Sequence, residues 1–509
     1  MPASSETHCL GIDLGTSGVK VLLIRRDGSV CAETTREYPI SAPQPLWSEQ
    51  NPLEWADATA AAIRAVLADA KITGDRIAAI GLSGQMHGLV LLDANGEPLR
   101  SAILWNDQRT AVECDEITRR VGSQRVLELT GNPILTGFTA PKLAWVRKHE
   151  PAVWSGIARV LLPKDYIRYR LSGEFATDVS DASGMSLLDV GRRMWSDEVC
   201  AALDVPRGWL ATVYESHEIS ARTRGEFARA AGLPDGVPIV AGAGDQAAGA
   251  IGCGLVDEGP ISVTIGTSGV VFAVSDAYRV EPNGRLHAFC HAAAGKWHLM
   301  GVMLSAGGSL RWYRDTLCAA QVAEATKQSR DAYELITDEA ATVAPGCDGL
   351  TFLPYLTGER TPHADPLARG AFVGLSARHT HAHLSRSVLE GVTFGLRDSV
   401  ELMRSAGVAI GELRVSGGGA RSELWRQMIA DVLGAPVFTA ATERGAAYGA
   451  ALLAAVGAGW SESVAAATRA CVKMTPRETP GTETRAAYEQ AYARFRDLYP
   501  ILKPHFAAL

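Results

Sequence analysis

The sequence lacks the motifs that mark several familiar classes of nucleotide-binding and disulfide-rich proteins. It contains no GxxxxGK[ST] loop and neither an HRD nor a DFG set, which excludes a P-loop nucleotidase and a protein kinase. The nine cysteines form no CxxC pair, and their number is odd in a chain too long to need disulfide staples. This cysteine usage indicates a reducing cytoplasm.

Long apolar runs and basic clusters are also missing. The longest stretch of small apolar residues, 446–459, is interrupted by glycines, so we interpret it as a packed helix and not as a membrane span. The N-terminal segment lacks the basic region and apolar core of a secretory signal. The net charge is −7, and lysine and arginine are scattered. We therefore expect a cytoplasmic protein that binds neither nucleic acid nor membrane.

The chain is long, and strand-like and helix-like sequence patterns alternate along it. A sequence of 509 residues, 47% of them hydrophobic, exceeds one compact domain, so two sizeable domains are expected. Apolar β-rich runs alternate with amphipathic runs: residues 10–24 predict a hairpin, 52–70 a helix and 77–82 a strand, while 483–498 predict a docked terminal helix. The alternation predicts an α/β fold with some antiparallel hairpins.

An internal repeat is the most informative feature of the sequence. The segment LGTSGVKVLLI at 14–24 recurs as IGTSGVVFAV at 265–274, and the segment 254–260 before the second copy has the composition of a linker. The repeat predicts two lobes that share one ancestral unit, the first formed by residues 1–254 and the second by residues 258–509.

Each copy of the repeat carries a tight turn in which glycines flank two hydroxyl residues. Such a turn exposes backbone N–H groups, and its small side chains let an anion approach them. A single GTSG is typical of an ordinary hairpin turn, but two copies in facing lobes suit a triphosphate that is held from both sides. We expect phosphate contacts from Thr16, Ser17, Lys20, Gly266 and Thr267.

The two copies differ in the residue that precedes the turn. Asp13 stands before the first turn, whereas Thr264 holds the equivalent place in the second. Mg²⁺ takes a few carboxylate or water oxygens plus phosphate oxygens, and a lone aspartate beside a phosphate turn suits that role. We expect Asp13 to hold Mg²⁺ and to support catalysis. The alternative is an aspartate that bonds its own turn.

A third glycine cluster, SGGGARS at 416–422, follows an apolar stretch and precedes a helical pattern at 423–433. A strand that ends in glycines before a helix lets a flat ring lie against bare backbone, which suits the adenine and ribose of a nucleotide. We therefore expect Gly418, Gly419 and Ser422 to contact the nucleotide.

Asp245 is the candidate general base. It stands where a buried-looking strand ends and a helix of small residues begins, with glycines around it that leave room for a substrate. Aspartate is also a favoured helix N-cap, so capping is the alternative interpretation. Its position near the end of the first lobe favours a base that accepts the proton of an attacking hydroxyl during phosphoryl transfer.

Two polar segments that follow predicted strands indicate a pocket for a polyol: SGQMHG at 83–88 and WNDQR at 105–109. Sugars need planar hydrogen-bonding side chains beside a ring or methyl-like surface, and these segments supply both. Taken singly, a structural histidine and a core tryptophan are the alternatives for His87 and Trp105. The expected sugar contacts are Met86, His87, Trp105, Asn106, Asp107 and Gln246.

With the paired turns, the late GGGARS segment and Asp245, the sequence resembles the FGGY carbohydrate kinases of the actin, Hsp70 and hexokinase superfold. The likeness runs nearly end to end and includes both family signatures, which begin at GFTAPKLAWV (137–146) and GAFVGL (370–375). The resemblance implies two RNase H-like lobes with ATP and sugar in the cleft between them. It also implies that Asp245 accepts the proton, that Met86 and His87 contact the sugar, and that Asp13 supports the metal.

Within the family, the segments IDLGTSGVK, SGQMHG, ILWNDQR and FLPYLTGERTPH are similar to those of members that phosphorylate D-xylulose. The resemblance thus implies ATP-dependent conversion of D-xylulose to D-xylulose 5-phosphate, a step of D-xylose catabolism.

The alternatives are a family member that acts on ribulose, fuculose or arabinitol, and a nucleotide-driven binding machine such as actin, which needs no sugar pocket. A sugar-responsive repressor would need a helix-turn-helix ahead of the first strand. Expected partners are ATP and the sugar, with a homodimer as the assembly to test.

Overall fold

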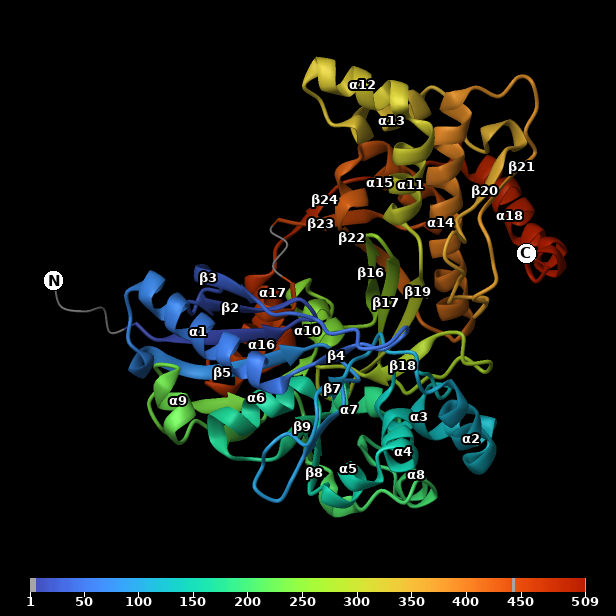
Figure 1. The fold of residues 1–509 in the computed structure, drawn as a ribbon. Helices are drawn as coiled ribbons and strands as arrows, with labels where there is room; N and C mark the ends of the chain where they lie inside the picture. Colours follow the sequence, from blue (N-terminus) through green and yellow to red (C-terminus); the bar gives the residue numbers. More distant parts are fainter. Residues whose placement is uncertain (1–5, 442–444, 509) are drawn as a thin grey trace.

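The computed structural model describes residues 6–441 and 445–508. Its two lobes are each built around a seven-stranded mixed sheet (Figure 1). The first sheet has the order β13-β14-β5-β1-β2-β3, with β15 beside β5, and the second has the order β18-β19-β17-β16-β22-β23-β24. The strands of the first sheet are β1 (His8–Leu14), β2 (Gly18–Ile24), β3 (Val30–Glu37), β5 (Ile77–Gly84), β13 (Ile219–Arg222), β14 (Pro238–Val240) and β15 (Ala243–Gly244). Those of the second are β16 (Gly259–Ile265), β17 (Gly269–Ser275), β18 (His287–Cys290), β19 (Trp297–Met303), β22 (Ile410–Ser416), β23 (Val437–Ala440) and β24 (Met474–Pro476).

The two sheets share a five-stranded core with the same order and directions. Strands β1, β2 and β3 form an antiparallel meander, β5 lies parallel to β1, and β14 lies parallel to β5. Strands β16, β17 and β19 form the same meander, β22 lies parallel to β16, and β23 lies parallel to β22. This duplication confirms the repeated unit predicted from the two GTSG turns, and with it the α/β fold of two RNase H-like lobes.

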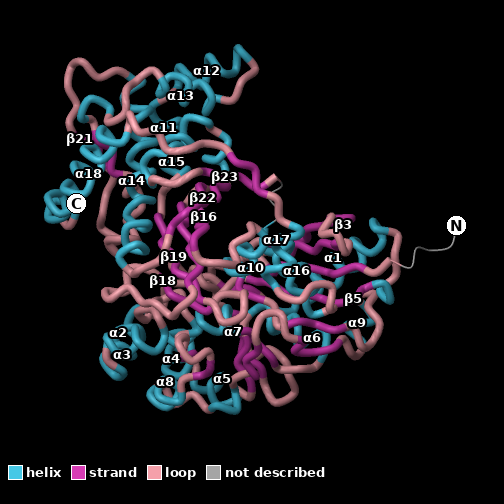
Figure 2. Tube along the Cα trace, turned by 180° about the vertical axis from the view of Figure 1, so that it is seen from behind, coloured by secondary structure: helices cyan, strands magenta, loops and turns pink. Residues whose placement is uncertain are grey.

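Helices cover both faces of the first sheet. On one face α1 (Pro52–Ala70), which has the predicted bounds, buries Trp55, Ile63 and Val66. Its start is fixed by Asn51, whose side chain accepts a hydrogen bond from Leu53 N at 3.1 Å. On the other face lie α10 (Asp245–Gly252), α16 (Gly445–Gly457) and α17 (Val464–Cys471). Figures 1 and 2 both place α16 and α17, from the end of the chain, beside the N-terminal sheet.

Glycines allow α16 to lie directly on the backbone of the first lobe. A Cβ atom added at Gly81 of β5 would stand 1.8 Å from Ala450 O, and one added at Gly449 of α16 would stand 1.8 Å from Ala248 O of α10. The contact is therefore backbone against backbone, which only glycine permits. The segment of small residues at 446–459 is confirmed as a packed helix.

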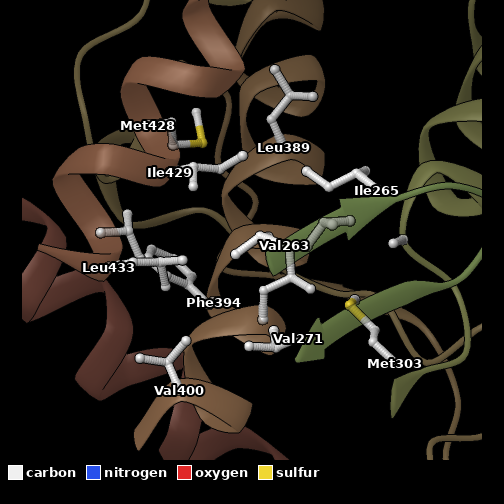
Figure 3. Close-up of a cluster of buried hydrophobic side chains, with 14 of the residues drawn as sticks. Val263, Ile265, Val271, Met303, Leu389, Phe394, Val400, Met428, Ile429 and Leu433 are labelled. Carbon is white, nitrogen blue, oxygen red and sulfur yellow. The ribbon is translucent and has the colours of Figure 1, made fainter. Parts of the chain in front are cut away.

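The second lobe has the larger hydrophobic core. Figure 3 shows Val263, Ile265 and Val271 of its sheet packed against α14 (His381–Ser405) and α15 (Glu423–Leu433), whose Phe394 and Ile429 point toward them. The terminal helix α18 (Arg485–Phe506) completes this layer and extends beyond the predicted 483–498. The other elements of this lobe are α11 (Gly307–Leu317), α12 (Ala319–Gln328), α13 (Ala332–Ala341), β20 (Thr351–Leu353) and β21 (Ala371–Val373).

A long excursion between β5 and β13 forms the base of the first lobe and has its own hydrophobic core. Cys290 of the second sheet is buried in that core, so the excursion touches both lobes. Its helices are α2 (Ala111–Val121), α3 (Ser123–Thr130), α4 (Thr139–His149), α5 (Pro151–Gly156), α6 (Pro163–Ser172), α7 (Val179–Ala182) and α8 (Asp197–Ala202), and α9 (Glu226–Ala230) follows β13. Its strands are β6 (Val90–Leu92), β7 (Ala102–Ile103), β8 (Arg159–Leu161), β9 (Ala176–Asp178), β10 (Leu188–Asp189), β11 (Met194–Trp195) and β12 (Thr212–Tyr214), and β4 (Glu49–Gln50) pairs with β7. Across residues 6–441 and 445–508, none of the helices combines the length and apolar character needed to cross a bilayer.

The glycine contact between α10 and α16 gives a stability prediction. The variant Gly449→Ala places a methyl group where Ala248 O stands, so we expect a loss of about 2 kcal/mol or more, seen as a fall in Tm of several degrees. Gly249→Ala, on α10, serves as the matched control, because a Cβ atom added at Gly249 has no other atom within 4 Å. Alanine favours the helix there, so its Tm should hold or rise. Equal Tm values for the two variants would contradict the close contact of Gly449 with Ala248 O.

Candidate active site

The predicted catalytic residues meet where parallel strands of the first sheet end. Strand β5 lies parallel to both β1 and β15, and Ser83 is in register with Asp13 on one side and Ala243 on the other. Asp245 follows Gly244, the last residue of β15. Ligands of open α/β sheets bind beyond such carboxyl ends, so this edge of the sheet is where a substrate is expected.

Asp245 is the first residue of α10, and Gly244 occupies the N-cap position without any side-chain capping bond to this fully described helix. The structure therefore does not support the capping alternative. Burial raises the pKa of Asp245 to about 7, and the nearby negative charge of Asp13 acts in the same direction. A carboxyl group with a pKa near neutrality is well matched to accept a proton at physiological pH.

A buried hydrogen-bond chain fixes the backbone just before Asp245. Gly244 N donates to Ser180 Oγ at 3.1 Å, and Ser180 Oγ donates to Asp178 Oδ2 at 2.5 Å. Ser216 Oγ donates to the same carboxylate oxygen at 3.2 Å. Since Asp178 also caps α7, the short helix and the loop that carries Asp245 are held as one unit.

That carboxylate belongs to a cluster of charged side chains, each at most 1% exposed. Lys164 Nζ lies 2.7 Å from Asp165 Oδ1, 2.9 Å from Asp178 Oδ1 and 3.2 Å from Asp181 Oδ2. Arg168 Nη1 lies 2.5 Å from Asp165 Oδ1. Three acidic groups face two cations, and burial raises the pKa of Asp181 well above its usual range.

Asp13 lies beside the first turn, and its Oδ1 atom is buried without a hydrogen-bond partner in the described part of the chain. Burial raises the pKa of this carboxyl to about 6. Lys20 is paired elsewhere, since its Nζ lies 3.0 Å from Glu33 Oε2. Among the described residues, no group of three or more His, Cys, Asp or Glu side chains is placed to hold a metal ion. A single orphaned carboxylate oxygen fits Mg²⁺, which takes most of its ligands from phosphate and water.

A backbone hydrogen bond from the first glycine closes each GTSG turn, to the fourth residue in the first turn and to the third in the second. Gly15 N donates to Gly18 O at 3.0 Å in the first turn, and Gly266 N donates to Ser268 O at 3.0 Å in the second. Trp105 Nε1 donates to Thr16 Oγ1 at 2.9 Å, and Arg311 Nη2 donates to Thr267 Oγ1 at 3.3 Å. Ser17 is exposed at the tip of its turn. Both turns are thus braced by neighbouring side chains.

A cavity of about 440 Å³ in the second lobe brings together most of the predicted nucleotide contacts. It is bounded by the second turn and by the glycine cluster that begins α15. Ser422 caps this helix by accepting a hydrogen bond from Trp425 N at 3.3 Å. The lining residues include Gly266, Thr267, Gly418, Gly419 and Ser422, together with Arg311, Tyr333 and Trp425.

A second cavity, of about 540 Å³, lies between the lobes and contains Asp245. Of the predicted sugar contacts it is lined by Met86, His87, Trp105 and Gln246, and Ser268 of the second turn reaches it as well. The lining from the second lobe includes His287, Phe289, Glu359 and Arg360. Asp245 therefore faces a space to which both lobes contribute.

His87 is held in one orientation and one tautomer. Its Nδ1 atom lies 2.7 Å from Gly184 O, and because a carbonyl oxygen only accepts, Nδ1 carries the hydrogen. Its ring stacks on Phe138 with 4.3 Å between centroids, and Lys142 Nζ donates to His87 O at 2.9 Å. Burial lowers the pKa of His87 to about 3, so the ring is neutral and Nε2 remains an acceptor.

Two predicted sugar contacts lie elsewhere. Asp107 is fully buried, and its Oδ2 atom accepts hydrogen bonds from Ser48 N and Arg109 Nη2, both at 2.7 Å. Asn106 is exposed on the same loop and does not line the cavity. These bonds hold the loop that presents Trp105.

Several residues that line the cavity had no predicted role. Phe138 stands in the family signature GFTAPKLAWV, and Arg360 stands in FLPYLTGERTPH, one of the segments similar to members that phosphorylate D-xylulose. His287 lies on β18, and its Nδ1 atom lies 2.8 Å from Asn132 Oδ1 across the two lobes. The two segments were the available signal, since they combine aromatic and charged residues with turn formers.

Comparison with known proteins agrees with this geometry. Residues 8–252 match the N-terminal domain, and residues 261–458 the C-terminal domain, of the FGGY family of carbohydrate kinases. The xylulose kinase of Escherichia coli (strain K12) is 44% identical over 98% of this chain and 100% of its own length. That of Bacillus subtilis (strain 168) is 38% identical over 98% and 97%. The crystal structure of xylulose kinase from Rhodospirillum rubrum is 32% identical, covers 98% of this chain and 100% of its own, and has a TM-score of 0.91. The chain belongs to the FGGY family of carbohydrate kinases.

Proposed function

We propose that this sugar kinase transfers the γ-phosphate of ATP to the 5-hydroxyl of D-xylulose and releases D-xylulose 5-phosphate and ADP. The observation that carries the proposal is a carboxyl group of raised pKa, Asp245, which faces a cavity between the lobes. Relatives named xylulose kinase, at up to 44% identity over nearly the whole chain, support the choice of sugar. The nine free cysteines fit a reducing cytoplasm.

In the proposed reaction the sugar lies in the interlobe cavity with its 5-hydroxyl at Asp245. The oxygen attacks the γ-phosphorus while the bond to the bridging oxygen of ADP breaks, and the hydroxyl proton passes to the Asp245 carboxylate. In a loose phosphoryl transition state the proton moves late, so a base of moderate strength is sufficient. The neutral His87 ring offers Nε2 as an acceptor for another hydroxyl, and Met86 supplies apolar contact.

The two GTSG turns are proposed to hold the phosphates through backbone N–H groups, with Thr16, Ser17, Thr267 and, less directly, Lys20 around them. Gly418, Gly419 and Ser422 are proposed to border the nucleoside. Mg²⁺ would be held by Asp13 and phosphate oxygens, and it would neutralise charge that develops on the transferred group. Closure of the cleft would exclude water, which competes with the sugar for the phosphoryl group.

We also propose that the chain divides into a first lobe of residues 1–254 and a second of residues 258–509. The boundary falls between the two sheets, since Asp257 precedes β16 and α10 ends at Gly252. Helix α16 crosses the division, because it lies in sequence between β23 and β24 of the second sheet and packs on the first. A homodimer is the assembly that we would test, by light scattering of the purified chain.

The choice of sugar can be checked with an ADP-coupled assay over a panel of ketoses and polyols. We expect D-xylulose to give the highest kcat/KM and no comparable ADP release without a sugar, because the interlobe cavity is built for a polyol. A higher kcat/KM for D-ribulose, L-fuculose or D-arabinitol would overturn the sugar assignment and leave the kinase intact. Release of ADP that no sugar stimulates would favour a nucleotide-driven binding machine.

The role of Asp245 can be checked by pH dependence. A base must be ionised, so the kcat/KM of the wild-type enzyme should rise with pH and level off above about 7, the raised pKa of Asp245. Asp245→Asn should lose about 10² to 10⁴ in kcat above pH 7, and the loss should shrink at lower pH, where Asp245 of the wild type is protonated. Ionisation of a carboxyl with a raised pKa destabilises the folded state, so above pH 7 the asparagine variant should be at least as stable as the wild type. Near-normal kcat in this variant would show that another group is the base.

A catalytic role of Asp13 can be distinguished from a structural role by mutation. Asp13→Ala should lower kcat by about 10²-fold or more, since the carboxylate would act on metal-bound phosphate, while Tm changes little. Loss of its charge should also lower the pKa of Asp245, so the residual activity should begin at a lower pH than in the wild type. A variant with normal turnover and a low Tm would instead mean that Asp13 only stabilises its turn.

A further inference from the structure

Arg360 reaches the sugar cavity from the second lobe. It belongs to the loop between β20 and β21, and it lines the interlobe cavity together with Met86, His87 and Asp245. The first lobe supplies the base and the histidine, so this loop forms part of the opposite wall.

The backbone on both sides of Arg360 is fixed to the end of β19. Glu359 Oε1 accepts hydrogen bonds from Leu304 N at 2.9 Å and from Arg360 N at 2.8 Å. On the other side, Thr361 N donates to Val302 O at 3.0 Å, and Thr361 Oγ1 accepts from Val302 N at 3.1 Å. The position of the Arg360 Cα atom is therefore set in advance, as a ligand-binding side chain requires.

The guanidinium group of Arg360 has no bonded partner among the described residues. Within residues 6–441 and 445–508 it makes no ion pair and no side-chain hydrogen bond. Its neighbour Glu359 does not neutralise it, because burial raises the pKa of that carboxyl to about 8 and Oε1 is already bonded to backbone N–H groups. The positive charge of Arg360 contributes, after burial, to the lowered pKa of His287. Arg360 is exposed and lines the cavity, so its N–H donors are open to a ligand that accepts hydrogen bonds.

The chemistry of the proposed substrate supplies such an acceptor. In a 2-ketopentose the ring forms when the 5-hydroxyl adds to the C2 carbonyl, so the ring form has no free 5-hydroxyl. A sugar that is phosphorylated at C5 is therefore open-chain and has a free carbonyl oxygen. A carbonyl oxygen only accepts hydrogen bonds, whereas the catalytic carboxylate of Asp245 and Nε2 of His87 are themselves acceptors.

We infer that Arg360 donates hydrogen bonds to the carbonyl oxygen of the open-chain ketose and so selects a ketose over the corresponding pentitol. The inference rests on the proposed function. Donors then come from the second lobe and acceptors from the first, so the sugar bridges the cleft. A guanidinium presents several N–H donors in a fixed plane and suits a carbonyl oxygen better than a hydroxyl, which also needs an acceptor.

The test compares Arg360→Met and Arg360→Lys with the wild type. Arg360→Met should lower kcat/KM for D-xylulose by about 10- to 100-fold, the usual effect of losing a hydrogen bond to a charged group. The inhibition constant of xylitol, in which the carbonyl is reduced, should change less than about threefold, and the KM for ATP should change as little. Arg360→Lys keeps the charge without the planar fork and should fall between the two.

Arg369→Met is the matched control. Arg369 lies on the same loop, but its Nη1 atom donates to Pro366 O at 3.0 Å and Ala368 O at 2.9 Å, and it does not line the cavity. Its ratio of D-xylulose to xylitol affinity should equal that of the wild type. Equal losses for D-xylulose and xylitol in Arg360→Met, or a KM for ATP that rises as much, would overturn the inference. If Arg360→Met fails to fold, the comparison is made on Arg360→Lys. A wild-type enzyme that does not phosphorylate D-xylulose would overturn the proposed function itself.

Discussion

The arrangement of the active site depends on one steric constraint, the close approach of α16 to the backbone of the first lobe. Glycines at positions 81 and 449 leave no room for a Cβ atom, so α16 contacts β5 and α10 directly. The strand β5 ends at the segment 83–88, which we propose contacts the sugar, and α10 begins at Asp245. A helix that lies in sequence between two strands of the second sheet therefore holds the two elements that carry the proposed site of the first lobe. The interface of α16 with β5 and α10 is too closely packed to slide. Any relative movement of the lobes therefore has to occur outside this interface.

The two lobes contribute different charged groups to the cleft. The first lobe contributes two carboxyl groups, Asp13 and Asp245, whose pKa values burial raises to about 6 and about 7. The second contributes the cation Arg360, whose guanidinium has no ion-pair or hydrogen-bond partner in the described part of the chain, and a buried carboxyl, Glu359, of raised pKa. Acceptors and donors thus face each other across the space in which we propose that the sugar lies. Both lobes line that cavity, so the proposed site for an uncharged polyol needs the pair.

Much of the fold was predictable because it is encoded locally. The hairpin at 10–24 follows from alternation and turn residues, and the repeat at 265–274 implied the second sheet from the first. The role of Asp245 was harder to predict, because its segment also suits an N-cap, and only the structure places Gly244 at the N-cap instead. Asp107 illustrates the limit, since a polar side chain after a strand says nothing of a partner such as Ser48, which lies far away in sequence. Arg360 was missed for the same reason.

The buried cluster around Lys164 affects how this sequence can change over time. Its charges face one another, Arg168 also donates to Ala176 O, and Asp178 is linked through Ser180 to the loop of Asp245. Replacing the lysine or the arginine would leave buried carboxylates without a cation, which is far more costly than the loss of one bond. Replacing this charged cluster by an apolar core without loss of stability would need several substitutions at once. We therefore expect these positions to change together in evolution and not singly.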